Sequence, residues 1–199
     1  MRRLKHVAAA AGLGLLCACV APVGPVEVTR FHVPGAAQLG QGTIAVEAAP
    51  GEDGQSLELR TYAAAVSREL ARIGYAEMVA GSASSQQVAL VSVDRRVWRQ
   101  GRDAGPVSVG VGGNAGSYGS GVGVGIGVNL SGPPPEQIET RLSVTIRERG
   151  TGQTLWEGRA SFTVKATAPL ASSSLGAARM AEALFRDFPG RSGETILVK

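Results

Sequence analysis

Side chains that commonly act as nucleophiles or bind transition metals are scarce in this sequence. The chain contains two cysteines, Cys17 and Cys19, and two histidines, His6 and His32. A zinc or other transition-metal site needs several such ligands around one ion. Two cysteines this close to the N-terminus point instead to a covalent modification of a thiol.

The residues in front of Cys19 are arranged like a secretory signal. A basic start, Met1 to Lys5, precedes an apolar run of about ten residues from Val7 to Leu16. This run is too short to span a bilayer. With an aliphatic residue at the third position before the cysteine and small residues between, the segment resembles the bacterial lipoprotein pattern. We therefore expect cleavage between Ala18 and Cys19, and attachment of a diacylglycerol and an N-acyl chain (palmitate) to Cys19.

The expected anchor predicts where the protein resides. Several acyl chains hold a protein stably at a membrane, at about 0.8 kcal/mol for each buried CH₂ group. The residue after the cysteine is Val20, whereas Asp there favours the inner membrane in the lipoproteins that this chain resembles. We expect an outer-membrane protein facing the periplasm, with a signal over 1–18, a short proline-stiffened tether over 19–25 and one domain over 26–199.

Removal of the signal also changes the charge balance. The loss of Arg2, Arg3 and Lys5 lowers the number of basic residues from 20 to 17, against 16 acidic residues. Nucleic-acid binding requires a concentrated basic face. The one dense basic cluster, residues 95–99, is interpreted as the polar end of a strand, so we expect no nucleic-acid partner.

The hydrophobic pattern predicts two helices among several strands. The first helix, Gln55–Ile73, has an apolar stripe and ends before Gly74, a residue suited to a helix C-terminus. The last helix has a predicted buried stripe of Leu175, Ala178, Ala181, Leu184, Phe185 and Phe188. Strands are predicted over Val26–Val33, Thr43–Ala48, Tyr75–Val79, Gln87–Trp98, a hairpin within Arg141–Val164, and Thr195–Val198. The expected fold class is α+β: an antiparallel sheet with two amphipathic helices packed on one face.

A glycine-rich insert over residues 105–132 interrupts this pattern with eleven glycines. Strict alternation at its centre would place aliphatic residues on one face of a strand and glycine on the other. Three interpretations stay open: an internal hairpin, a flap that orders on meeting a partner, or an edge for intermolecular strand addition. The candidate interaction residues are Gly121, Val122, Gly123, Val124, Gly125, Ile126 and Gly127.

Several segments together resemble a bacterial lipoprotein family known as domain of unknown function 4136. They are the residues before Cys19, the helix end Ala71–Tyr75, the segment Thr151–Ala160 and a last helix closing on Phe188-Pro189. A glycine-rich insert before the hairpin is also common in that family. The resemblance implies an envelope location and this fold, and it transfers no catalytic residues.

The sequence favours a non-catalytic binding or scaffolding role in the cell envelope, without cofactor or metal. The partner would be the membrane, through the lipid anchor, and an envelope protein or a second copy of the chain. One alternative is an envelope-modifying hydrolase that uses His32, because a single histidine suffices for a triad. No G-x-S-x-G motif accompanies it. The other alternative is self-assembly through the glycine-rich edge.

Overall fold

A computed structural model describes residues 24–99, 107–116, 119–128 and 135–199 of the chain. The predicted signal, its cleavage site and Cys19 therefore lie outside the described residues. The strands are β1 (Val26–His32), β2 (Thr43–Ala48), β3 (Ala76–Met78), β4 (Gln87–Arg99), β5 (Val107–Gly116), β6 (Gly119–Val128), β7 (Glu136–Glu148), β8 (Thr154–Lys165) and β9 (Thr195–Val198). The helices are α2 (Leu57–Arg72), the short 3₁₀ turn η2 (Pro169–Ala171) and α3 (Ser173–Phe185).

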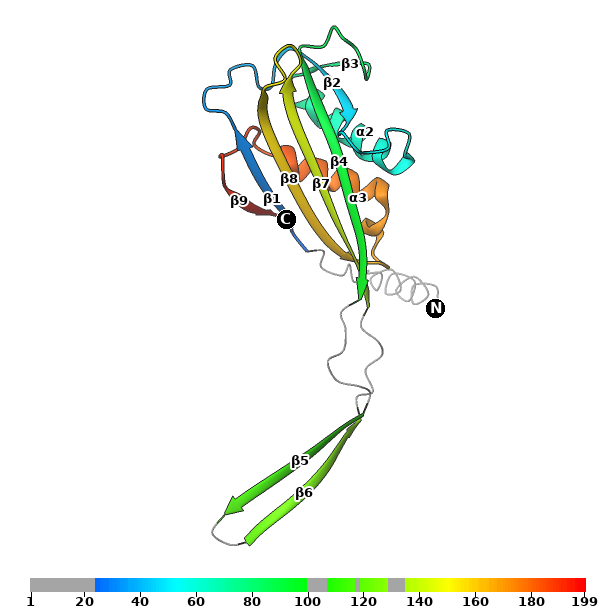
Figure 1. Cartoon of the computed structure of the whole chain (residues 1–199), viewed down its shortest axis with the longest axis vertical. Helices are drawn as coiled ribbons and strands as arrows, with labels where there is room; N and C mark the ends of the chain where they lie inside the picture. Colours follow the sequence, from blue (N-terminus) through cyan, green and yellow to red (C-terminus); the bar gives the residue numbers. More distant parts are fainter. Residues whose placement is uncertain (1–23, 100–106, 117–118, 129–134) are drawn as a thin grey trace, which may run out of the picture.

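Seven strands form one sheet in the order β3-β2-β4-β7-β8-β1-β9 (Figure 1). The sheet is mixed, so the prediction of an antiparallel sheet was wrong for one side of it. β2 runs parallel to both β3 and β4, whereas the other neighbours are antiparallel. The reason is the crossover through α2. This helix follows β2 and carries the chain back to the end of the sheet at which β2 began, so β3 runs in the same direction as β2.

The two helices and the sheet share one hydrophobic core. α2 contributes Leu59, Tyr62, Val66 and Leu70, all 5% exposed or less. Its first turn begins at Ser56, whose hydroxyl accepts a hydrogen bond from the backbone N–H of Leu59 at 3.4 Å. Its last turn is followed by Gly74, which has a φ of +118° and so a conformation that favours glycine.

The buried face of α3 differs from the predicted stripe. Leu175 is 51% exposed and Ala178 is also exposed, whereas Gly176, Ala177 and Met180 are buried. The helix presents its small residues inward because it approaches the preceding segment closely. A Cβ added at Gly176 would lie 2.9 Å from the carbonyl oxygen of Leu170. The predicted stripe is therefore confirmed at Ala181, Leu184 and Phe185 and wrong at Leu175 and Ala178, so the buried face at the start of the helix is rotated from the predicted one.

Gly158 of β8 occupies a position where no side chain fits. A Cβ at this residue would lie 2.2 Å from Cη2 of Trp156 and 2.8 Å from Cδ1 of Leu184. The indole of Trp156 also stacks on Phe185 at 5.4 Å between ring centroids. A glycine inside a strand indicates either a bulge or a close packing neighbour. The close neighbour is confirmed, and the irregularity in this strand pair lies between Ile146 and Arg147.

The glycine-rich insert contains a separate two-stranded antiparallel sheet, β5–β6. Its register pairs aliphatic positions with one another, such as Val109 with Ile126, and pairs glycine with glycine, such as Gly110 with Gly125. The candidate interaction residues 121–127 pair with residues 108–114 of β5. One edge of β6 is thus used within this hairpin, and an interaction with a partner stays a prediction.

We predict that Gly158→Ala lowers the free energy of unfolding by about 1–3 kcal/mol, because the new methyl group overpacks the contact with Trp156. Urea denaturation of the purified domain measures this. Gly150→Ala is the matched control, since a Cβ there has no neighbour within 4 Å. Equal stability of the two variants would contradict the packing account.

Candidate functional site

An open groove lies between α2 and the β2–β3 side of the sheet. It consists of two adjoining depressions with volumes of about 870 Å³ and 360 Å³. Both are lined by Val46, Ala63, Ala64, Arg68 and Ala80. The crossover that makes β2 and β3 parallel also creates this groove, because it lays α2 beside the short edge strand.

The floor and walls of the groove are largely apolar. Small side chains such as Ala48, Ala63 and Ala64 leave room along the helix. Leu57 is 78% exposed and Val79 is 83% exposed, the two highest values among the large hydrophobic residues in the described part of the chain. Leu57 lines the larger depression and Val79 the smaller one. Exposed apolar residues that gather in one groove, instead of scattering, are typical of interaction sites.

Two arginines border the apolar floor. Arg60 and Arg68 lie on either side of Ala64 at four-residue steps along α2, and therefore close to one face of the helix. Within the described ranges, neither arginine has a carboxylate within salt-bridge distance. Both also line the larger depression. The groove therefore suits a ligand that combines apolar surface with negative charge.

The acidic residue in the larger depression, Glu47, is held by partners of its own. Its Oε1 atom forms a salt bridge with Arg149 at 2.5 Å and accepts a hydrogen bond from the backbone N–H of Gly81 at 3.2 Å. Arg149 also donates from Nε to the hydroxyl of Ser85 at 2.8 Å. This network fixes the loop after β3 against β2. Glu77, exposed in β3, adds one negative charge at the far end of the groove.

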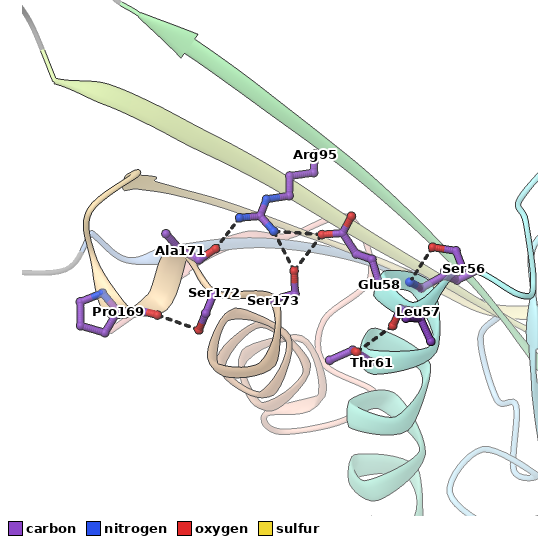
Figure 2. A network of polar contacts seen from close by, with 10 residues as sticks. Ser56, Leu57, Glu58, Thr61, Arg95, Pro169, Ala171, Ser172 and Ser173 are labelled. Atoms are coloured by element: carbon purple, nitrogen blue, oxygen red, sulfur yellow. Dashed lines mark hydrogen bonds and ion pairs between the residues drawn. The ribbon is translucent and has the colours of Figure 1, made fainter.

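Arg95 of β4 fixes the helical wall of the groove (Figure 2). Its Nη1 atom donates to Glu58 at 3.0 Å and to the hydroxyl of Ser173 at 2.7 Å. Its Nη2 atom donates to the carbonyl oxygen of Ala171, and Ser173 in turn donates to Glu58 at 2.9 Å. One guanidinium thus joins the first turns of α2 and α3 to the sheet. Leu57 and Ser174, the neighbours of these residues, line the groove.

Tyr62 lies in the core near this network. Burial raises the pKa of its hydroxyl, and a hydrogen bond with Thr140 partly offsets this effect. Tyr62 is 1% exposed and Thr140 is 6% exposed. The phenol therefore stays neutral at ordinary pH and acts as a buried hydrogen-bonding group beside Arg95.

His32, the candidate histidine of the hydrolase alternative, lies far from the groove in sequence and in the sheet. It is in β1, where Nε2 is 3.2 Å from the carbonyl oxygen of Gly190 and Nδ1 is 3.3 Å from that of Val33. Both ring nitrogens are therefore near backbone carbonyls, and the contact ties the loop after α3 to β1. The part of the chain that the structure describes contains no group of three or more His, Cys, Asp or Glu side chains suited to a metal ion.

The groove could not be predicted from the apolar stripe of the first helix, because Arg60 and Arg68 lie outside that stripe. A signal was nevertheless present. Leu57 lies outside the apolar stripe of its helix. The three consecutive alanines Ala63–Ala65 leave this part of the helix surface without large side chains. Of the basic cluster 95–99, the structure assigns Arg95 to the helix-bracing network and ends β4 at Arg99. None of the helices in the described ranges is long and apolar enough to cross a bilayer.

The groove lies in a part of the chain that matches a known protein family. The family model "Domain of unknown function (DUF4136)" matches residues 43–190. The chain belongs to this family. The match runs from β2 through α3, and so includes the groove and the Arg95 network.

Individual relatives are more distant or shorter in their match. An uncharacterized protein of Zymomonas mobilis is 40% identical over 63 residues, which cover 32% of this chain and 24% of that protein. A PDZ domain protein from Parabacteroides distasonis is 10% identical with a TM-score of 0.47, over 88% of this chain and 39% of that one. The PelC dodecamer from Paraburkholderia phytofirmans is 13% identical with a TM-score of 0.44, over 80% of this chain and 96% of that one.

We predict that Arg95→Met destabilises the domain by about 1–3 kcal/mol, because it removes charged hydrogen bonds and leaves Glu58 and the Ala171 carbonyl without this partner. The control is Arg96→Met, whose side chain is 68% exposed and pairs with Asp94. That change should stay within about 0.5 kcal/mol. Chemical denaturation of both variants provides the measurement, and a neutral Arg95→Met would contradict the bracing role.

Proposed function

We propose that this protein is an outer-membrane-anchored periplasmic lipoprotein with a non-catalytic binding role, and that the groove beside α2 receives an apolar, acidic segment of another envelope protein. The observation that carries the proposal is the convergence of Leu57 and Val79 on one groove bordered by Arg60 and Arg68. Solvent exposure of such residues is unfavourable unless a partner covers them.

A polypeptide segment fits this groove better than a compact small molecule does. Small-molecule sites are usually concave and enclose most of the ligand surface. Here the groove is open along α2, and its arginines are two helical turns apart. An amphipathic segment could place apolar side chains on Ala63 and Ala64 and a carboxylate near each arginine, as helix-in-groove complexes do.

The groove can be tested by site-specific photocrosslinking in intact cells. A photoreactive amino acid at Ala64 should crosslink to an envelope protein, whereas the same residue at Ala71 should not. Both alanines are exposed on α2, and Ala64 lines the groove. Charge reversal by Arg60→Glu with Arg68→Glu should reduce the Ala64 crosslink at unchanged protein level, because the proposed partner is acidic. Crosslinks of equal yield at both alanines, or none at Ala64, would contradict the proposal.

The anchor is tested separately. Cys19→Ala removes the thiol that would carry the lipid, so the protein should move from the membrane fraction to the soluble periplasmic fraction. Metabolic labelling with a fatty-acid analogue should label the unchanged protein and leave the Cys19→Ala variant unlabelled. An unlabelled wild-type protein would contradict lipidation whatever its distribution between fractions.

A further inference from the structure

The far end of β4 extends beyond β2 on one side, while on the other side it stays paired with β7 up to Arg99. β2 ends opposite Val91, so the later residues of β4 form an edge of the sheet. The helical layer ends at Arg95, which the first turns of α2 and η2–α3 cover. Beyond it, Val97 is 59% exposed and Trp98 is 41% exposed, although successive strand residues point to opposite faces. Val97 is thus accessible on one face of this strand end, and Trp98 is accessible on the other.

The N-terminus of the described domain emerges at this same end. A Cβ at Gly24 would lie 3.8 Å from the carbonyl oxygen of Thr163. Thr163 pairs with Glu139, and Glu139 pairs with Arg96. Gly24 is therefore level with Arg96, two residues before Trp98. Figure 1 shows the start of β1 and the end of β4 at the same end of the sheet. The five residue-to-residue steps from Cys19 to Gly24 span at most about 18 Å even when fully extended.

Most charges at this end are paired, and the exposed Lys165, which lies opposite Gln137 in register with Trp98, adds one positive charge. Arg96 forms a salt bridge with Asp94 at 2.7 Å, and Arg99 forms one with Glu136 at 3.5 Å. The strand end is thus nearly neutral around its tryptophan. Such a surface is suited to the headgroup region of a membrane, where the amphipathic indole ring is favoured, more than to an anionic polymer.

We infer that the strand end formed by Val97 and Trp98 is a lipid-contacting surface, with the Trp98 indole inserted at the headgroup level of the membrane that holds Cys19. This inference rests on the proposed lipid anchor. It adds an orientation: the sheet stands with the end of β4 toward the bilayer. The groove then opens sideways, along the edge of the sheet, toward other envelope proteins.

The two tryptophans allow a direct test. Trp156 is fully buried, with Nε1 donating to the Pro189 carbonyl oxygen at 3.0 Å. Quenching by brominated lipids therefore reports on Trp98. The lipidated full-length protein is reconstituted into phosphatidylcholine vesicles with bromine on the acyl chains. Emission should fall relative to unbrominated vesicles, more for bromine near the headgroup than near the bilayer centre. A Trp98→Phe variant should lose this quenching while keeping its unfolding midpoint.

Vesicle flotation separates the two claims. Protein that floats with the vesicles but is not quenched would overturn the membrane contact of Trp98 and leave the anchor intact. Equal quenching in wild type and Trp98→Phe would also overturn the contact, because the signal would then come from Trp156. Failure of the wild-type protein to float would overturn the anchor and this inference with it.

Discussion

The guanidinium of Arg95 holds the first turns of both helices against the central strand β4, and most of the functional geometry depends on this contact. It lies where the helical layer ends, with Glu58 and Ser173 as partners on the two helices. On one side the contact positions Leu57 at the mouth of the groove. On the other it leaves Val97, the next residue on the helix-facing side of β4, uncovered. Arg95 therefore lies between the groove beside α2, which suits a protein segment, and the end of β4, which suits lipid.

Much of the fold could be predicted from the sequence because hydrophobic periodicity is local. β2 and β9 have the predicted bounds. Of the stripe predicted for the first helix, α2 buries Leu59, Tyr62, Val66 and Leu70, whereas Ile73 follows the helix and is partly buried. The direction of β3 could not be predicted in this way, since three residues carry no information about which neighbour they pair with. The rotation of α3 was missed for a related reason: Gly176 and Ala177 are buried because the helix is close to its neighbours, and closeness is a tertiary property.

The groove illustrates why binding sites are harder to predict than cores. Arg60 and Arg68 resemble ordinary solvated helix residues, and nothing in their spacing distinguishes them from Arg72, which pairs with Glu69. Their role depends on β3 and the loop after it, which bring Val79 and Ala80 beside the helix. The proposed lipid anchor at Cys19 is the opposite case. It is a purely sequential signal, so the sequence analysis could state it without any knowledge of the fold.

The central claim is that the groove beside α2 is covered by a partner in the cell. The proposed maturation removes Cys17 and modifies Cys19, so a single introduced cysteine would be the one free thiol. Val79→Cys at the groove and Leu197→Cys on β9 both replace exposed residues. A membrane-impermeant maleimide, admitted through a permeabilised outer membrane, should label the cysteine at position 79 more slowly in cells than in the purified protein, while labelling at position 197 is unchanged. Equal rates at position 79 in cells and in the purified protein would contradict the central claim.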